Sequence, residues 1–304
     1  MKELIVYSQE VQDALGCGVP VVALESTIIA HGMPYPENVN TAKRLGNIIR
    51  DAGCVPAIVA VSEGKVCVGI DDVLLERIAK EKGVLKVSRR DIPIAIASKA
   101  LGATTVSGTL VIAHAAGIKV FVTGGIGGAH RGAETSMDVS SDLEELAISD
   151  VAVVSAGVKA ILDLPKTLEI LETKGVPVVG YKTDELPAFY TRSSGLKLVA
   201  RADTVDEVAC IMKSKWDLGI SGSVLIANPI PQEFEADPKV INAAIENALI
   251  RANEEGIAGK EITPFILSLV SEATGGDSLA ANVALVENNA RLGAQIAFAF
   301  SKLV

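Results

Sequence analysis

The chain has 304 residues, 49% of them apolar but only 4% aromatic, and its formal net charge at pH 7 is −9. This length can bury a large core, which must consist mainly of Val, Ile, Leu and Ala and therefore suits a largely parallel sheet covered by helices. The negative charge argues against a surface for nucleic acids or anionic membranes, and no apolar run reaches the ~18 residues of a membrane span.

Strands and helices are predicted to alternate along the chain. The predicted elements are helix 8–15, strand 19–25, helix 38–52, strands 56–61 and 65–70, helices 71–82 and 104–116, strand 118–122, helix 141–148, strand 151–155, helix 165–174, strands 176–181 and 224–227, and helices 240–254, 264–274 and 278–300. Helical crossovers favour parallel pairing, whereas the turn at Glu63-Gly64 predicts one antiparallel hairpin. We therefore expect an α/β fold with three layers (α/β/α), a mixed, largely parallel central sheet and a helical C-terminal part, in a single domain over residues 1–304.

The segment Thr123–Asp142 is the first candidate for a functional site. It joins the strand 118–122 to a helix predicted to begin at Ser141, with Glu144 at capping-box spacing. Loops of about 18 residues are usually functional or disordered. Its glycines could let backbone N–H groups point inward, and its charged side chains could hold an anion and a cation side by side. The alternative is a glycine-rich surface loop with incidental charges.

Glu25 directly follows a buried strand and is a candidate general acid. Apolar neighbours disfavour the charged form of a carboxyl group and so favour the form that can donate a proton. The alternative is a carboxylate that caps the backbone at a strand end. In open α/β sheets, ligands bind outside the carboxyl ends of strands, and Glu25, the central loop and Lys159 all follow such ends.

Lys159 is a candidate amine nucleophile. It follows the strand 151–155 and precedes the apolar residues 160–162, so we expect it at the start of a helix. The helix dipole and burial would both favour the uncharged amine there, which can attack a carbonyl or sugar carbon. The alternative is a lysine whose charged end reaches the surface.

Asp138 is a candidate metal ligand. It lies among glycines and hydroxyls without His or Cys partners, a pattern that suits Mg²⁺ or Mn²⁺ held by one acid and several waters, rather than zinc. Of the three histidines, His114 is expected in the core on an apolar helix face. His31 and His130 occur in polar loops and could line a site.

The segment Gly275–Ser278 offers a second function. It resembles the glycine-Asp-Ser motif that kinases of the ribokinase family place at a helix start, where N–H groups bind an anion and the Asp acts as base. No Gly-rich ATP cradle of the Walker type accompanies it. A phosphosugar or nucleoside kinase is therefore the second candidate. A non-catalytic protein that binds a phosphorylated metabolite through the glycine loop is the third.

Five segments carry a more extensive resemblance: Ala23–Pro36, Gly124–Glu134, Met137–Asp142, Val154–Lys159 and Ala227–Pro231. In this order and combination they closely resemble the pseudouridine-5′-phosphate glycosidase family, which is related to indigoidine synthase A. The resemblance extends from about residue 5 to the C-terminus. It implies reversible cleavage of pseudouridine 5′-phosphate to uracil and ribose 5-phosphate, with a divalent metal, usually Mn²⁺.

Matching positions of the family imply roles for single residues. Lys159 is implied as the nucleophile that forms an adduct with C1′ of the ring-opened sugar, Glu25 as the proton donor and Asp138 as the metal ligand. The implied and expected substrate contacts are Lys86, Val106, Thr123, His130, Ser140, Ser141, Asp142 and Asn282. Among these, Lys86 and His130, with the loop amides, are the nearest candidates to hold the phosphate.

The implied reaction explains why these residue types are needed. A C–C glycosidic bond has a poor leaving group, and protonation of a leaving oxygen or nitrogen does not apply. Opening the ribose and linking C1′ to an amine provides an iminium-type electron sink, while an acid must protonate the uracil carbon. The two-carboxylate arrangement of ordinary glycosidases is not needed.

The expected partners are small molecules only, without nucleic acid or membrane, and the resemblance implies a homotrimer. Four scattered cysteines and the lack of a recognisable targeting segment favour a reducing, cytoplasmic location.

Overall fold

The structure, a computed structural model, describes residues 4–257, 259 and 262–304. The strands are β1 (Ile5–Tyr7), β2 (Val21–Leu24), β3 (Val55–Ser62), β4 (Lys65–Val68), β5 (Leu85–Val87), β6 (Gly102–Thr104), β7 (Val120–Val122), β8 (Ala152–Ser155), β9 (Val178–Tyr181), β10 (Ala200–Ala202) and β11 (Leu225–Ala227). The α-helices are α1 (Gln9–Cys17), α2 (Glu37–Asp51), α3 (Asp72–Lys80), α4 (Ile92–Ala97), α5 (Val106–Ala116), α6 (Ala133–Ser136), α7 (Ser141–Leu146), α8 (Leu164–Thr173), α9 (Val205–Asp217), α10 (Pro238–Glu254), α11 (Ile262–Ala273) and α12 (Asp277–Ser301). Shorter helical turns are η2 (Ile28–Gly32), η3 (Arg89–Asp91) and η4 (Gln232–Phe234).

The sheet is mixed and largely parallel, as the sequence predicted. Its main order is β1-β4-β3-β2-β7-β8-β11-β9-β10, with β6 on β3 and β5 on β6. Within the described residues, only the pairs β3–β4 and β3–β6 are antiparallel, and the first of them is the predicted hairpin. The central strands β2, β7 and β8 are buried and rich in Val and Leu, as expected for strands covered on both faces.

Two strands share one edge of β3. The first half of β3 pairs in parallel with β2, and its second half pairs with β6 through Ala60 and Val61. Ser26 marks the change, because its Oγ donates to the Val59 carbonyl (2.6 Å) and accepts from the Thr104 N–H (2.8 Å). The chain therefore leaves the sheet at a fixed point directly after Glu25.

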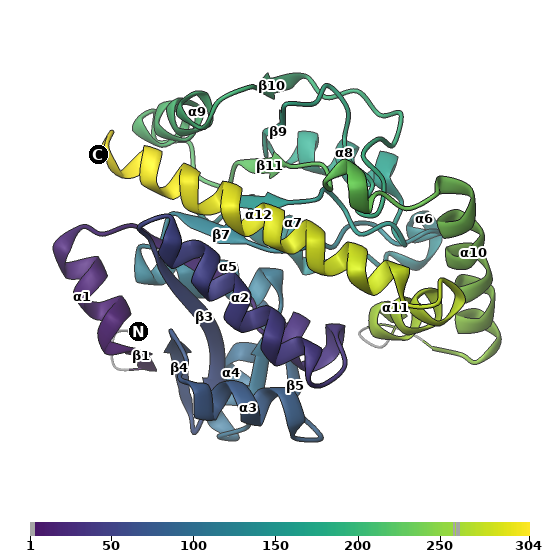
Figure 1. Cartoon of the computed structure of the whole chain (residues 1–304), viewed down its shortest axis with the longest axis horizontal. Helices are drawn as coiled ribbons and strands as arrows, with labels where there is room; N and C mark the ends of the chain where they lie inside the picture. Colours follow the sequence, from purple (N-terminus) through teal and green to yellow (C-terminus); the bar gives the residue numbers. More distant parts are fainter. Residues whose placement is uncertain (1–3, 258, 260–261) are drawn as a thin grey trace.

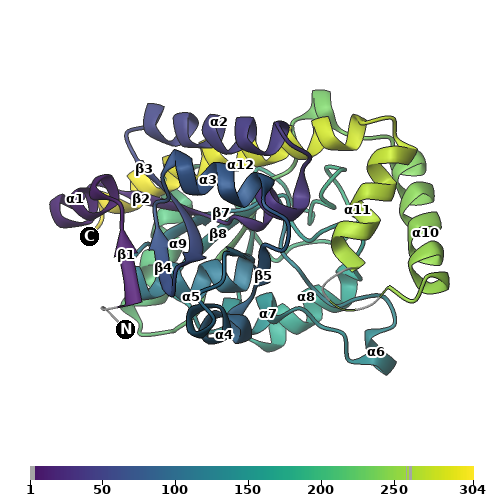
Figure 2. The ribbon, with the colours of Figure 1, turned by 90° about the horizontal axis from the view of Figure 1, so that it is seen from below.

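Helices cover both faces of the sheet, which gives the predicted three layers (Figure 2). α2, α9 and the long helix α12 lie on one face, and α4, α5 and α7 lie on the other. α12 lies so close to the sheet that a Cβ at Gly293 would come within 2.3 Å of the Val122 side chain. Its buried Asn289 donates through Nδ2 to the Thr123 carbonyl (2.9 Å) and accepts from Asn228 Nδ2 (2.9 Å). The last helix thus holds the end of β7.

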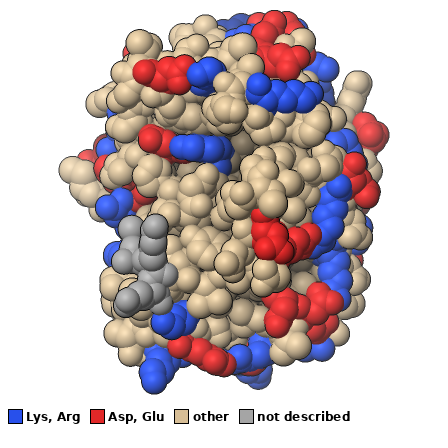
Figure 3. All heavy atoms as spheres, turned by 90° about the vertical axis from the view of Figure 1, so that its left-hand side faces the viewer, with Lys and Arg blue, Asp and Glu red and all other residues tan. Residues whose placement is uncertain are grey.

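α10 and α11 lie at one end of the sheet, opposite the end where both termini lie (Figure 1). On the face at the left of Figure 1, acidic and basic side chains are interspersed (Figure 3). None of the helices in the described part of the chain is long and apolar enough to cross a membrane.

Most predicted elements are confirmed, with boundaries shifted by a few residues. The elements β1, β5, β6, β10, α4, α6 and α9 were not predicted from the sequence. The predicted capping box at Ser141 is wrong: Ser140 is the N-cap of α7, and its Oγ accepts from the Asp142 N–H. His114 was expected in the core, but it is exposed, and its Nδ1 accepts from the Asp150 N–H (3.0 Å).

Candidate active site

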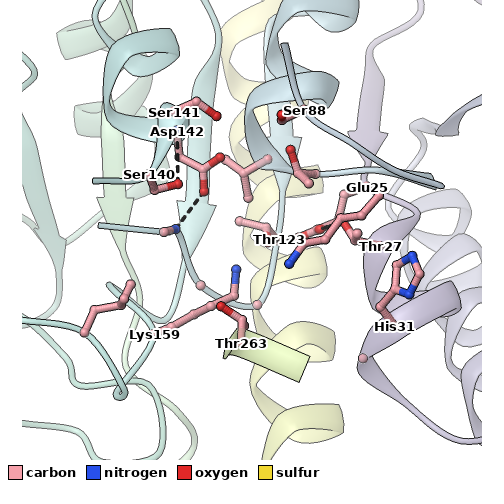
Figure 4. A pocket seen from close by; sticks show the side chains of 18 of the residues that line it. Glu25, Thr27, His31, Ser88, Thr123, Ser140, Ser141, Asp142, Lys159 and Thr263 are labelled. Carbon is pink, nitrogen blue, oxygen red and sulfur yellow. Dashed lines mark hydrogen bonds between the residues drawn. The ribbon is translucent and has the colours of Figure 1, made fainter. Parts of the chain in front are cut away.

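A cavity of about 770 Å³ opens at the carboxyl ends of the neighbouring strands β2, β7 and β8. Figure 4 shows that side chains from these strand ends, from the start of α7 and from α11 surround one space. All eleven residues predicted for the site line it: Glu25, Lys86, Val106, Thr123, His130, Asp138, Ser140, Ser141, Asp142, Lys159 and Asn282. The structure brings these residues together, and their individual roles stay predictions.

Glu25 is held by two hydroxyl groups. Thr123 Oγ1 donates to Glu25 Oε1, and Thr27 Oγ1 lies 2.5 Å from Glu25 Oε2. Thr27 Oγ1 also lies 2.7 Å from the Thr104 carbonyl oxygen. Thr27 and Thr123 are buried, whereas Glu25 is half-buried and lines the cavity. The carboxyl group is therefore fixed at the cavity wall in a single orientation.

Lys159 reaches the cavity from an irregular segment, so its predicted position at the start of a helix is wrong. α8 begins at Leu164, and Asp163 is its N-cap. The backbone of Lys159 is instead bound to the central loop, because its N–H donates to the Ile126 carbonyl (3.0 Å). The part of the prediction that relied on a helix dipole at Lys159 is therefore wrong. Lys159 still lies next to the glycine loop and at the cavity that Glu25 also lines.

Asp142 has both carboxylate oxygens bound to backbone groups. Oδ1 accepts from the Ser107 N–H (2.9 Å) and Oδ2 accepts from the Gly127 N–H (2.8 Å). The side chain is buried and connects the central loop to the first turn of α5. This arrangement suits a residue that positions the cavity wall.

Much of the backbone of the glycine loop is bonded within the protein, so only part of it could form the predicted cradle of inward-pointing N–H groups. The N–H groups of Thr123, Ile126, Gly127, Ala129 and His130 are already bonded to protein acceptors. Glycine is required for close approach: a Cβ at Gly127 would come within 2.3 Å of the Ser140 Oγ and 2.6 Å of an Asp142 carboxylate oxygen. The glycines therefore allow tight packing behind the cavity.

Hydroxyl groups line the wall between α5 and α7. Ser107 Oγ lies 3.0 Å from Ser141 Oγ and 3.1 Å from Thr105 Oγ1. Ser140 and Ser141 are half-buried at the cavity. Such groups can donate to the oxygens of an anionic ligand without adding charge.

Asp138, His130 and Lys86 form the charged side of the cavity. Burial lowers the pKa of the His130 imidazole; the Asp138 carboxylate acts in the opposite direction, and the Lys86 ammonium lowers it further. These electrostatic effects mean that the three groups lie near one another. A carboxylate and two basic side chains therefore line the same part of the cavity.

A cation at Asp138 would have to be held by few protein ligands. Among the described residues, no group of three or more His, Cys, Asp or Glu side chains is arranged to bind a metal ion. A half-buried carboxylate at the wall of a polar cavity fits Mg²⁺ or Mn²⁺ that keeps several of its waters. The residues present therefore fit the hard, oxygen-ligated cation that the sequence predicted.

Sequence reasoning missed several residues that line the cavity. These are Thr27, Ser88, Arg89, Arg90, Phe189 and Thr263. The basic run at Arg89-Arg90 was a usable signal. Arg89 forms an ion pair with the buried Glu145 of α7, and this pairing across the fold could not be read from the sequence. Phe189 has a φ of +65°, a strained conformation for a residue with a side chain.

The glycine-Asp-Ser segment does not take part in the cavity. Asp277 is exposed and is not among the residues that line it, and Gly276 adopts a positive φ at the turn between α11 and α12. Ser278 is buried. The segment is a helix connection, so the structure gives the kinase alternative no support.

Comparisons with known proteins match the whole chain. The family model described as indigoidine synthase A like protein matches residues 10–299. Pseudouridine-5′-phosphate glycosidases of Glaesserella parasuis and Caldanaerobacter subterraneus are 56% and 55% identical over 302 and 303 residues, which are 99% and 100% of this chain and 100% and 99% of theirs.

Two solved structures share the fold and much of the sequence. The prealnumycin C-glycosynthase AlnA in complex with ribulose 5-phosphate has a TM-score of 0.92 and 40% identity, covering 99% of this chain and 98% of its own. An indigoidine synthase A-like protein from Thermotoga maritima has a TM-score of 0.88 and 37% identity, covering 97% of this chain and 95% of its own.

Proposed function

This chain belongs to the indigoidine synthase A-like family, and we propose that it is a pseudouridine-5′-phosphate glycosidase. The proposed reaction converts pseudouridine 5′-phosphate and water reversibly to uracil and ribose 5-phosphate. The observation that carries the proposal is that Lys159 and the hydrogen-bonded carboxyl group of Glu25 line the same polar cavity. Full-length relatives of that name support the substrate.

Lys159 is proposed as the nucleophile. Its amine forms a bond to C1′ while the ring oxygen leaves with a proton, and this opens the ribose. The nitrogen lone pair can then form a C=N bond as the C–C bond to uracil breaks. Water adds to the resulting iminium, which releases ribose 5-phosphate and restores the amine.

Glu25 is proposed as the acid that protonates uracil C5. The electron pair of the breaking C–C bond needs a proton at that carbon, and general acids contribute about 10²–10⁴-fold to such steps. The two threonine hydroxyls hold the carboxyl group in place for this transfer. Its position at the carboxyl end of β2 is where ligands of α/β sheets bind.

Lys86, His130, Ser140 and Ser141 are proposed to hold the 5′-phosphate, and Val106, Thr123 and Asn282 to contact the rest of the substrate. A protein with a net charge of −9 needs local cations and donors for a dianion. The buried Asp142 is proposed to act on the substrate indirectly, by fixing Ser107 and Gly127.

Asp138 is the residue proposed to hold Mn²⁺ or Mg²⁺. When bound, such a cation supplies positive charge that orients and neutralises substrate oxygens. The homotrimer implied by the resemblance stays a prediction.

The test uses Lys159→Arg. Arginine keeps the positive charge but is not a nucleophile at neutral pH, so we expect a folded protein with no measurable release of uracil from pseudouridine 5′-phosphate in the presence of Mn²⁺. Borohydride added during turnover of the unchanged enzyme should attach a reduced ribose phosphate to Lys159, detectable by peptide mass spectrometry.

Lys166→Arg is the matched control, because Lys166 forms ion pairs with Asp163 and Glu134 at the start of α8. It should retain activity. An active Lys159→Arg enzyme, or an adduct trapped on another lysine, would refute the mechanism. Consumption of ATP by the enzyme would instead support the kinase alternative.

A further inference from the structure

The Thr27 hydroxyl group carries one proton but contacts two oxygen atoms at hydrogen-bonding distance. Its Oγ1 lies 2.5 Å from Glu25 Oε2 and 2.7 Å from the Thr104 carbonyl oxygen. Both distances are those of O–H···O hydrogen bonds, and two full two-centre bonds need two protons. The Thr27 hydroxyl has one proton, and a carbonyl oxygen has none. Of the groups in these two contacts, only Glu25 can supply the second proton.

A neutral Glu25 satisfies every contact. Its Oε2–H donates to Thr27 Oγ1, the Thr27 hydroxyl donates to the Thr104 carbonyl, and the Thr123 hydroxyl donates to Glu25 Oε1. An ionised Glu25 would leave two oxygen lone pairs facing each other on one side of Thr27. Thr27 is only 7% exposed, so bulk water has little access to relieve that contact.

We infer that Thr27 is a positioning residue that keeps the proton on Glu25 until the substrate takes it. The inference rests on the proposed function of Glu25 as the acid. Once the proton has left, rotation of the Thr27 hydroxyl directs its hydrogen from the Thr104 carbonyl to the new carboxylate. One side chain thus stabilises the acid before transfer and its conjugate base afterwards.

Other titratable groups line the same cavity: His31, Lys86, Arg89, Arg90, His130, Asp138, Asp142, Glu144 and Lys159. The two lysines, when charged, favour an ionised carboxylate. The fixed contacts of Thr27 and Thr104 oppose them, because the neutral acid makes one more hydrogen bond than the carboxylate can. A direct measurement of the proton is therefore the proper test.

The measurement is the infrared difference spectrum between the unchanged protein and Glu25→Gln, without substrate, at pH 7. We expect the C=O band of a protonated carboxylic acid, which shifts in D2O. Thr27→Ser keeps the hydroxyl and should keep the band in place, whereas Thr27→Val keeps the shape without the hydroxyl and should move or remove the band.

The kinetic arm uses the same variants with pseudouridine 5′-phosphate. Thr27→Val should lower kcat about tenfold, the worth of about one hydrogen bond, with KM within about twofold, and Thr27→Ser should restore most of kcat. Carboxylate bands alone in the difference spectrum, or a Thr27→Val protein with unchanged spectrum and kcat, would overturn the inference. An acid band in a protein that does not cleave the substrate would support the inference and refute the proposed function.

Discussion

The two halves of the central loop differ in almost every physical respect. The inner half, residues 123–129, is entirely buried, whereas the outer half, residues 130–139, is mostly exposed. The inner half is bound to β8, α7, α8 and α12, through partners such as Val154, Asp142, Thr167 and Asn289. Backbone bonds of the outer half lie largely within it, as in the bond from the His130 N–H to the Asp138 carbonyl (3.0 Å).

This difference indicates that the two halves of the loop have different roles. The inner half fixes the proposed covalent and acid groups, because Thr123 holds Glu25 and Ile126 binds the backbone of Lys159. The outer half presents Asp138 and His130, the residues proposed to hold a hydrated metal and the phosphate. Changes in the inner half should therefore affect folding, and changes in the outer half should affect ligands.

The largest expected effect is that of Asp138→Ala in the outer half. Loss of the carboxylate should lower turnover by about 10–100-fold or more at ordinary metal concentrations, with the melting temperature unchanged. Calorimetry should show weaker Mn²⁺ binding by the variant. Glu134→Ala is the control, because Glu134 is exposed and pairs with Lys166. Full activity of the unchanged enzyme in excess EDTA would contradict the metal assignment.

Gly127→Ala tests whether the inner half of the loop is required for stability. The added Cβ would meet Ser140 and Asp142 at distances no side chain tolerates, so the free energy of unfolding should fall by about 1–3 kcal/mol in urea titrations. Thr135→Ala, at an exposed site of the outer half, should change it by less than about 0.5 kcal/mol. Equal losses of stability in both variants would contradict the proposed difference between the two halves.

Lys86→Ala tests the phosphate assignment. Loss of one cation should raise KM for pseudouridine 5′-phosphate about tenfold with little change in kcat, since one charge-assisted contact is removed. Lys82→Ala, at an exposed position after α3, is the control. Steady-state kinetics with pseudouridine lacking the phosphate completes the test: equal turnover of the two substrates would argue against this role.

The smallest expected effect concerns pH. The folded protein lowers the pKa of His130 below its ordinary value of 6.5, mainly by burial. As the pH falls through about 6.5, the unfolded chain takes up this proton before the folded protein does, so stability is lost. His130→Gln should lose less stability than the unchanged protein between pH 8 and 5.5 in urea titrations. His114→Gln, at an exposed position, is the control, and identical pH profiles for all three proteins would refute the prediction.

The sequence predicted the location of the site well, because parallel strands end on one edge and polar residues follow those ends. It failed where structure depends on contacts distant in the chain. The strands β5 and β6 are three residues long and form only because β3 offers an edge. The helix 165–174 was predicted to within one residue of α8, but Lys159 was wrongly expected at a helix start, although Asp163 before Pro165 is a recognisable start signal.

The roles of single residues were harder to predict than their presence. Glycines at 124–128 suggested N–H groups free for an anion, but the Gly127 N–H is bound by Asp142 and the neighbouring Ala129 N–H by Thr167. Likewise, Thr27 looks like an ordinary loop residue until Thr104 is found beside it, 77 positions later in the chain. Hydrogen-bond partners of this kind are set by the fold and leave no local pattern.

The clamp of α12 on the end of β7 has a consequence for synthesis of the protein. Asn289 is translated 166 residues after the Thr123 carbonyl that it binds. Asn282, at the cavity, belongs to the same helix. A nascent chain that has already made Glu25, Asp138 and Lys159 still lacks the element that holds the end of β7. The end of β7 and the cavity beside it can therefore reach their final form only after α12 has been synthesised.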